Sequence, residues 1–259
     1  MNVAEHNRQA WNDESDDDCD WSIPVEPAVI EAARNGEFEI CLTTRSSVPR
    51  EWFPENLTGL KILCLASGGG QQAPVLAATG AKVVDLDISD SQLAKDRLVA
   101  ERDGLDFRTE QGEMNDLSRF ADESFDLIFH PASNCFIPDV NPVWRECHRV
   151  LRPNGTLLSG FMNPAFYLFD HYDAEERGIL EVKYPLPYSD LTTLSDEDRE
   201  IVVKKRGTVE FGHTLNDLIG GQLRSGFVIT DLYEDYWEDS ATLLNVYSPT
   251  SIATRAKRM

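Results

Sequence analysis

An almost wholly apolar segment that leads into three consecutive glycines is the strongest constraint on the fold of this chain. Residues 61–66 (KILCLA) predict a strand that is buried on both faces. The residues after the glycines, 71–79, predict a helix that ends at Gly80. A buried strand that turns through glycines into a helix is typical of parallel sheets covered by helices. We therefore expect a sheet built from βαβ units.

Strands and helices continue to alternate along the chain. Ser89, with Gln92 three residues later, predicts the start of a helix that closes at Gly104. Another helix is predicted to start at Asn141 and to stop at Pro153-Asn154-Gly155. The pattern as a whole predicts an α/β fold with a doubly wound, mostly parallel sheet. The remaining predicted strands are residues 82–88, 105–109, 125–129, 156–161, 227–233 and 251–255, and the remaining helices are residues 26–34 and 216–225.

Two regions depart from this alternation. Residues 162–206 contain several prolines and the polar run SDEDRE, which predict an insertion after the fifth strand. Residues 1–59 predict an N-terminal helical cap ahead of a ligand-binding domain over residues 60–259, and its acidic run 13–20 (DESDDDCD) is expected to be solvated. The aromatic side chains of the cap either form a lid over a ligand or pack the cap against the sheet: Trp11, Trp21, Trp52 and Phe53.

The composition limits the partners of the chain. It carries 45 acidic and 24 basic side chains, a formal net charge of −21. Nucleic acids and anionic membranes require clustered basic residues, so we expect neither as a partner and favour a small-molecule substrate. No apolar run approaches the roughly 20 residues that cross a bilayer. The five cysteines and five histidines show neither disulfide nor metal-ligand spacing, which predicts reduced thiols in the cytoplasm and no metal. Nothing in the sequence indicates an oligomeric state.

The glycine segment and Asp87 together indicate a ligand site. Ala66, Ser67, Gly68, Gly69 and Gly70 form a loop that lets the backbone approach a ligand closely, although such a loop can also be a tight turn without a ligand. Asp87 ends the second predicted strand, beside the first, where a carboxylate can accept hydrogen bonds from both hydroxyls of a ribose. The alternative for Asp87 is a favourable charge at the start of the next helix.

A third segment follows the predicted third strand. In Gly112-Glu113-Met114, an acid stands where it can accept a hydrogen bond from the amino group of adenine, and a methionine stands where it can pack on the ring. The alternative is an ordinary loop. This segment, the glycine loop and Asp87 favour an adenosine-type ligand.

Four blocks in order resemble the small-molecule class I methyltransferases that use S-adenosylmethionine (SAM). The blocks are ILCLASGGG at residues 62–70, VDLDIS at 84–89, GEMNDL with SFDLIF at 112–117 and 124–129, and RVLRPNG at 149–155. The likeness covers residues 60–161, and dehydrogenases do not share the fourth block. It implies a Rossmann-like sheet of seven strands whose last strand is antiparallel, with SAM lying across the ends of the first three.

The resemblance also implies roles for single residues. Gly68 and Gly70 would contact the methionine part of SAM, with Ala66, Ser67 and Gly69 in the same loop. Asp87 would hold the ribose, and Ile88, Glu113 and Met114 the adenine. The sequence departs from the family at Cys64, where an acid is frequent, and at Ala66, which replaces a glycine. Two residues can replace the missing acid as partners of the SAM amino group: Gln71 and Gln72.

Candidate residues for the acceptor side follow the predicted fourth strand and lie in the insertion. His130 is a candidate general base, cofactor contact or substrate anchor, because imidazole titrates near neutrality, but it can also be a histidine satisfied within a loop. Asn134 can orient a polar group of the substrate, and Tyr167 and His171 can reach over the site. Two other classes of function stay open at this point: a non-catalytic SAM-binding scaffold and an NAD(P)-dependent oxidoreductase.

Overall fold

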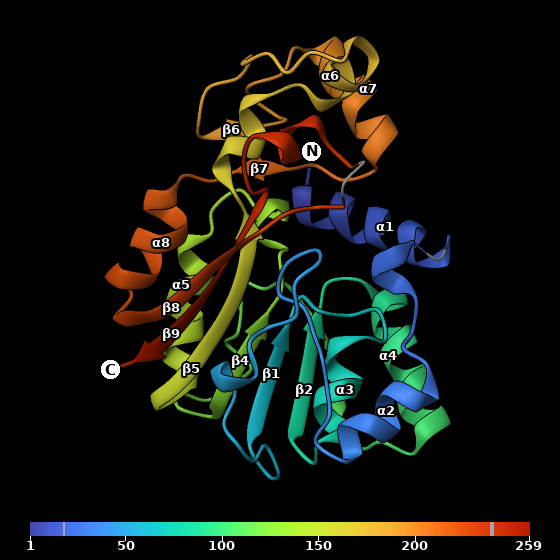
Figure 1. Cartoon of the computed structure of the whole chain (residues 1–259), viewed down its shortest axis with the longest axis vertical. Coiled ribbons are helices and arrows are strands. Elements are labelled where there is room, and N and C mark those ends of the chain that lie inside the picture. Colours follow the sequence, from blue (N-terminus) through green and yellow to red (C-terminus); the bar gives the residue numbers. More distant parts are fainter. Residues whose placement is uncertain (18, 239–240) are drawn as a thin grey trace.

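A seven-stranded sheet forms the centre of the computed structural model, which describes residues 1–17, 19–238 and 241–259 (Figure 1). The strand order is β3-β2-β1-β4-β5-β9-β8. The order reverses between β1 and β4, as expected for a doubly wound sheet. The strands are β1 Lys61–Leu65, β2 Lys82–Asp87, β3 Arg108–Gln111, β4 Phe125–His130, β5 Leu151–Met162, β8 Phe227–Asp235 and β9 Ser251–Arg258.

The pairing of these strands confirms the predicted fold class. β1 pairs in parallel with β2 and β4, β2 with β3, and β4 with β5. β9 lies between β5 and β8 and is antiparallel to both. The last strand therefore has the antiparallel direction that the family resemblance implies.

Helices cover both faces of the sheet. Alternate residues of a strand point to opposite faces, and here both faces carry apolar side chains that need to be buried. On β1, Ile62 and Cys64 belong to one buried cluster and Leu63 and Leu65 to another. The first cluster packs under α2 (Pro27–Arg34), α3 (Gln72–Ala78) and α4 (Asp90–Asp103). The second packs under α5 (Asn141–Val150) and α8 (Leu215–Arg224). The near-continuous apolar sequence of β1 thus reflects burial on both faces.

The ends of α4 confirm the predicted capping residues. The Ser89 hydroxyl accepts a hydrogen bond from the Gln92 backbone N–H at 3.1 Å. Gly104 ends the helix in the left-handed conformation, at φ 63°. The Gln92 side chain, however, donates to the Ser22 hydroxyl at 2.7 Å instead of returning to Ser89. Only one of the two reciprocal hydrogen bonds of a capping box is therefore formed.

The N-terminal segment contains a long helix. α1 spans Val3–Asp16 and takes in the first half of the acidic run, whose Asp13, Asp16, Asp17 and Asp20 are exposed as expected; Asp18 of that run lies outside the described residues. Asn2 caps the helix by accepting from the Glu5 backbone N–H. In Figure 1, α1 lies between the sheet and the upper part of the molecule. Its position over the strand ends makes it part of the cavity described below.

Two strand boundaries also differ from the prediction. β3 covers Arg108–Gln111 instead of residues 105–109, because Leu105 and Phe107 pack against the core just before the ladder begins. β5 begins at Leu151, directly after α5, and not at residue 156. The Pro-Asn-Gly segment lies inside β5, where Asn154 has φ 64° and the register with β4 shifts.

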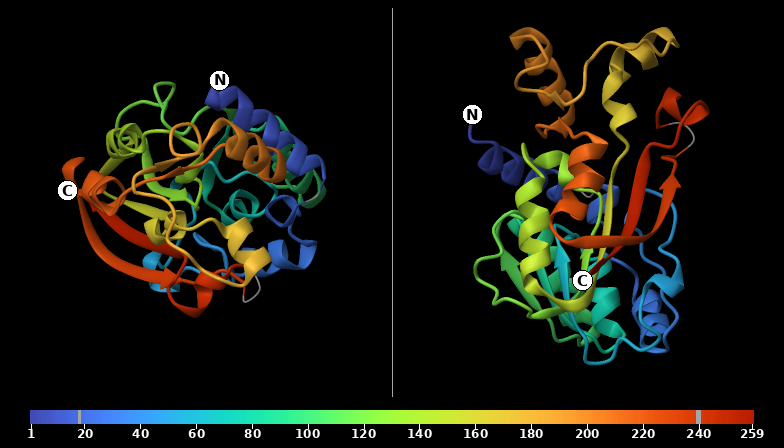
Figure 2. Two further views of the ribbon diagram at one scale, coloured as in Figure 1. Left: turned by 90° about the horizontal axis from the view of Figure 1, so that it is seen from above. Right: turned by 90° about the vertical axis from the view of Figure 1, so that its left-hand side faces the viewer.

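The segment between β5 and α8 contains no further strand of the main sheet. It comprises α6 (His171–Arg177), α7 (Asp196–Arg206) and a small antiparallel pair, β6 (Tyr188–Ser189) and β7 (Phe211–Gly212). Figures 1 and 2 place α6 and α7 at one end of the molecule, beyond α1. No helix in the described parts of the chain has the length and apolarity needed to cross a membrane. Short 3-10 helices cover Asp20–Ser22, Arg50–Trp52, Asn134–Phe136, Pro164–Leu168 and Leu243–Val246.

Candidate functional site

A cavity of about 1010 Å³ lies at the carboxyl ends of the central strands. Its walls come from the loops after β1, β2, β3 and β4, from α1, from residues 39–44 and from the insertion. This is the edge of a doubly wound sheet where ligands bind. Its volume is at the upper end of the usual range for ligand pockets, about 300–1,000 Å³, which leaves room for a cofactor and a second molecule.

The glycine loop is held in a fixed shape around the start of α3. Ala66 has a positive φ of 52°, and a Cβ on Gly68 would lie 2.7 Å from the Cβ of Gln92. Ala66, Ser67 and Gly68 line the cavity. The N–H groups of Gly69 and Gly70 instead donate to the buried Asp96 carboxylate, both at 3.1 Å. The predicted contacts of Gly69 and Gly70 with the cofactor are therefore not supported, and these residues anchor the loop.

Asp87 faces the cavity and also fixes the surrounding backbone. Its Oδ2 accepts from the Gly68 N–H at 3.1 Å and its Oδ1 from the Ser89 N–H at 2.8 Å. Burial raises the pKa of this carboxyl group, and the hydrogen bonds from Ser89 and Gly68 oppose that change. The two interpretations from sequence are thus compatible: the same carboxylate faces a ligand space and supports the start of α4.

The segment after β3 reaches the same cavity. Ile88, Glu113 and Met114 all line it, with Met114 buried and Glu113 exposed. The Gln111 side chain donates to the Ile88 carbonyl at 3.1 Å and so joins the ends of β2 and β3. The structure therefore brings the three predicted segments together; their contacts with a cofactor stay predictions.

Two buried acids beneath the loop were missed from the sequence. Asp85 and Asp96 have no exposed surface, and their carboxyl groups interact with each other. Asp85 also accepts from the Ser67 hydroxyl at 3.1 Å. The signal was present, since Asp85 is a second acid within an otherwise apolar strand. Asp85 pairs in register with Cys64, so an acid that the family places on β1 stands here on the adjacent strand.

The two glutamines after the loop occupy different positions. The Gln71 side-chain amide donates to the carbonyls of Asp20 and Ile23, at 2.8 and 3.1 Å, and so ties the N-terminal segment to the loop. Gln71 and Gln72 both line the cavity. The described residues contain no cluster of three or more potential ligands that could hold a metal ion.

His130 and Asn134 do not have the environment that their predicted roles require. The His130 ring has no exposed surface; its Nδ1 lies 2.7 Å from the Leu65 carbonyl oxygen and its Nε2 lies 2.9 Å from Oδ1 of Asn134. Asn134 is also buried and donates to the Gly160 carbonyl at 3.2 Å. Neither residue lines the cavity. The structure therefore places His130 inside the protein and away from the cavity, which favours its alternative as a structural histidine over a base, cofactor contact or substrate anchor.

The four aromatic residues of the N-terminal segment divide between the two expected roles. Trp11 and Trp21 line the cavity. Trp52 is buried and donates through its indole N–H to Asp231 at 2.9 Å. Phe53 stacks on Phe129 with the ring centres 6.3 Å apart. The first two therefore belong to the cover of the cavity, and the last two pack the segment against the sheet.

Tyr167 and His171 both line the cavity, and their contact with a substrate stays a prediction. The Tyr167 hydroxyl donates to the Glu210 carboxylate at 2.9 Å. The His171 ring stacks on Phe166 with the ring centres 3.9 Å apart, and burial lowers its pKa. Glu210 and Arg206, which also line the cavity, were missed because they follow no recognisable motif.

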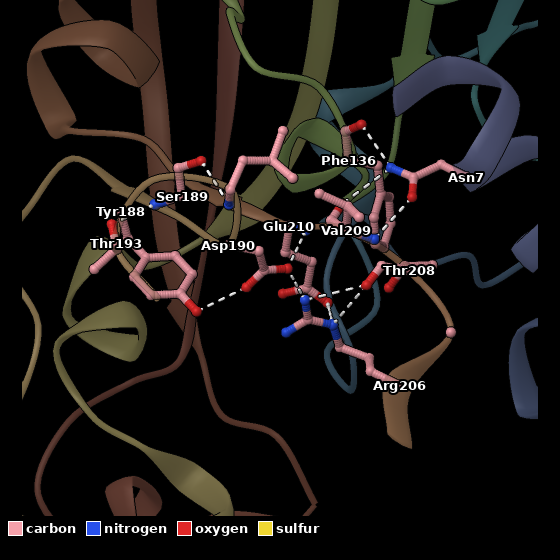
Figure 3. A network of polar contacts seen from close by, with 12 residues as sticks. Asn7, Phe136, Tyr188, Ser189, Asp190, Thr193, Arg206, Thr208, Val209 and Glu210 are labelled. Carbon is pink, nitrogen blue, oxygen red and sulfur yellow. Dashed lines mark hydrogen bonds and ion pairs between the residues drawn. The ribbon is translucent and has the colours of Figure 1, made fainter. Parts of the chain in front are cut away.

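α1 is fastened to the rim of the cavity by Asn7. This side chain donates to the carbonyls of Phe136 and Val209, each at 2.9 Å, and accepts from the Val209 N–H at 2.8 Å (Figure 3). Phe136 follows β4, and Val209 precedes β7 of the insertion. One buried amide therefore joins α1, the central sheet and the insertion.

Comparison with known proteins identifies the family. Residues 63–159 match a family model described as a methyltransferase domain. The chain is 47% identical over 257 residues to the uncharacterized methyltransferase YbaJ of Bacillus subtilis, covering 99% of each protein. It is 32% identical over 128 residues to a ubiquinone biosynthesis O-methyltransferase of Pseudomonas syringae, covering 48% of this chain and 55% of that protein.

The fold agrees with these matches. A SAM-dependent methyltransferase structure from Mesorhizobium loti superposes with a TM-score of 0.62 at 21% identity, over 81% of this chain and 95% of that one. The relationship to the Bacillus protein extends over almost the full length of both chains, which excludes the alternative of an NAD(P)-dependent oxidoreductase. The chain is a member of the class I SAM-dependent methyltransferase family.

Proposed function

We propose that this enzyme binds SAM beside the glycine loop and transfers its methyl group to a small molecule held under α1 and the insertion. The observation that carries the proposal is that one cavity is continuous from Ala66–Gly68 and Asp87 to Tyr167 and Glu210. When bound, SAM supplies a methyl group on a positively charged sulfur, and a nucleophile of the acceptor takes that methyl group while the sulfur keeps the electron pair of the broken bond.

Three features of the cofactor side support SAM as the ligand. Asp87 offers carboxylate lone pairs at the end of β2 for the ribose hydroxyls. Ile88 and Met114 offer apolar surface for the adenine ring, with Glu113 beside them. The backbone of Ala66–Gly68 approaches the cavity without a bulky side chain.

The acceptor side supports catalysis by positioning and exclusion of water. Trp11 on α1 and residues 39–44 also line the cavity. Holding two reactants in line can supply several kcal/mol, about 7–11 at most, toward the barrier. Tyr167 and Glu210 are the polar pair that faces the acceptor, in place of His130.

A cytoplasmic enzyme acting on a small molecule fits the composition. All five cysteines are free thiols in the structure, as is usual in a reducing compartment. The net charge of −21 opposes binding to nucleic acids and anionic membranes.

The test is calorimetric titration with S-adenosylhomocysteine, the demethylated cofactor. We expect Asp87→Ala to weaken binding at least about tenfold, or about 1.4 kcal/mol, because charge-assisted hydrogen bonds are lost. Asp106→Ala, which removes an exposed acid before β3, is the matched control and should bind as the wild type does. Equal affinities of the two variants would remove Asp87 from the cofactor site.

Turnover separates an enzyme from a scaffold that only binds SAM. The protein is incubated with SAM and a panel of small acceptors, and S-adenosylhomocysteine release and acceptor mass are measured. Release that depends on an acceptor supports the proposed function. Tight cofactor binding without any turnover across a broad panel favours the scaffold.

A further inference from the structure

The part of the cavity under the insertion is lined by a continuous series of aromatic rings. Trp237 lies 5.8 Å from Phe166, and Phe166 lies 5.4 Å from Tyr167, measured between ring centres. Tyr167 then lies 5.4 Å from Tyr188, and Tyr188 5.4 Å from Tyr184. All five rings line the cavity. Such a surface binds a planar ring by stacking and a cation through the negative faces of the rings.

A guanidinium between two carboxylates stands at the edge of these rings. Arg206 forms ion pairs with Asp190 and, at 3.0 Å, with Glu210 (Figure 3). The Asp190 side chain is completely buried and also accepts from the Tyr188 hydroxyl at 2.7 Å. Glu210 lines the cavity and also accepts from the Tyr167 hydroxyl. The ion-pair group therefore contacts the aromatic surface through two tyrosine hydroxyls.

The charge of this group is negative. Two carboxylates surround one guanidinium, and among the described residues Arg206 is the only lysine or arginine in the cavity wall. The other acids of this end are Asp170, which is paired with Lys183 at 2.8 Å, and Glu175, which is exposed. A negative charge brought here would meet further negative charge, whereas a positive charge would balance it.

We propose that the methyl acceptor carries a positively charged amine on an aromatic or apolar body, and that the amine binds at Glu210 within the ring series Trp237, Phe166, Tyr167, Tyr188 and Tyr184. This inference rests on the proposed function, since it names the substrate class of the same cavity. Burial raises the pKa of Glu210, so an ammonium group beside it also stabilises the charged form of that carboxylate.

The position of Arg206 argues against a carboxylate acceptor. An arginine that recognises a carboxylate presents its paired N–H groups to the ligand. Here Nε and one terminal nitrogen of Arg206 are already directed to Glu210, Asp190 and the Thr208 carbonyl. Arg206 thus holds the two acids in place instead of attracting an anion.

Three probes with the same ring and different charges test the proposal. They are tyramine, which carries an ammonium group, 4-ethylphenol, which is neutral, and 3-(4-hydroxyphenyl)propionate, which carries a carboxylate. Each is titrated calorimetrically into the protein saturated with S-adenosylhomocysteine. We expect tyramine to bind at least about tenfold more tightly than 4-ethylphenol, and the carboxylate to bind weakest.

Two variants and a control locate the site. Glu210→Gln should reduce tyramine affinity about tenfold and leave S-adenosylhomocysteine affinity unchanged. Trp237→Leu alters no charge and lies outside the ion-pair group. It should reduce the affinity for tyramine more than the affinity for 4-ethylphenol. This variant tests the same cavity if Glu210→Gln is unstable. Glu55→Gln removes an equal charge from an exposed position and should change neither affinity.

The outcomes separate this inference from the proposed function. Failure of S-adenosylhomocysteine to bind would contradict the cofactor proposal, and the same probe series on the cofactor-free protein then still tests the acceptor class. The inference is overturned if tyramine does not bind, if the carboxylate binds as tightly, or if neither Glu210→Gln nor Trp237→Leu affects tyramine.

Discussion

Asp85 and Asp96 are two carboxyl groups that share a fully buried space beneath the glycine loop. Burial, and next the charge of Asp87, raise the pKa of Asp85 from 3.8 to about 7. Burial, and next the charge of Asp85, raise the pKa of Asp96 well above its ordinary value. Oδ2 of Asp85 is buried and has no hydrogen-bond donor within the described part of the chain, from which we infer that the two acids share a proton. The loop therefore rests on two buried acids whose pKa values are both raised.

This pair predicts a pH dependence of stability. An acid whose pKa is raised by folding keeps its proton where the unfolded chain has lost it, so the contribution of Asp85 to the free energy of unfolding falls as pH rises from 3.8 to about 7. Asp85→Asn removes that titration and retains a donor for Asp96. We expect the stability of the variant relative to the wild type to increase by at least about 1 kcal/mol between about pH 4 and pH 8, as measured by urea unfolding.

An exposed acid provides the control for that measurement. Asp106→Asn should leave the difference from the wild type constant over the same pH range. If Asp85→Asn also gives a constant difference, the two buried acids do not share a proton as inferred.

The residues of the candidate site could be predicted only where they belong to a short, recognisable sequence pattern. The glycine loop follows β1, and Asp87 ends β2. Adjacent parallel strands bring their carboxyl ends together, so the sequence was enough to predict that the two lie side by side. His130 was different: the sequence shows an imidazole after β4 but not that both of its nitrogens have partners inside the protein. Glu210 lies about eighty residues after His130 in the chain, and only the folded insertion brings it to the cavity.

At the scale of elements, the attachment of α1 determines how closed the cavity is. Asn7 is buried, and its three hydrogen bonds reach both the segment after β4 and the insertion. Asn7→Ala leaves the Phe136 and Val209 backbone groups without these partners. We expect a loss of at least about 2 kcal/mol in unfolding free energy, and hydrogen exchange in α1 that accelerates more than in α5.

A neighbouring residue on the same helix is the control. Gln9 is exposed and its amide donates to Asp13 within α1 at 2.8 Å, so Gln9→Ala should change helix exchange little. Equal exchange rates for α1 in the Asn7→Ala and Gln9→Ala variants would show that other contacts hold the helix in place.

The elements differ in how well their sequences define them. β1 and α4 were predictable because an apolar run and a Ser89 cap are local signals. The same kind of signal marks α1, since Asn2 caps it and Glu5 stands three residues later, but the acidic run obscured it. β3 is an edge strand, and the apolar residues Leu105 and Phe107 pack against the core just before it begins to pair with β2. The alternation of apolar and polar residues therefore predicted the residues that pack and not the residues that form the strand hydrogen bonds.

For the whole molecule, the acidic surface has an energetic consequence separate from binding. With 45 acidic and 24 basic side chains, repulsion between like charges across the folded protein exceeds attraction between opposite charges. Most of the ion pairs are partly exposed, for example Arg177 with Asp173 at 2.8 Å, and such pairs contribute about 0–1 kcal/mol each. Salt weakens both kinds of interaction. It therefore removes more repulsion between the many unpaired acids than attraction within these ion pairs.

This balance predicts that added salt stabilises the protein at neutral pH. Raising NaCl from about 0.01 M to about 0.1 M shortens the screening distance from about 30 Å to about 10 Å and weakens the long-range repulsion. We expect the melting temperature at pH 7 to rise by about 2–4 °C, which corresponds to about 1 kcal/mol for a protein of this size. Near the isoelectric point of about 4.5 the net charge vanishes, so the same addition of salt should have no stabilising effect. A melting temperature that falls with salt at pH 7 would mean that the ion pairs, and not the excess of acids, dominate the electrostatic energy of the fold.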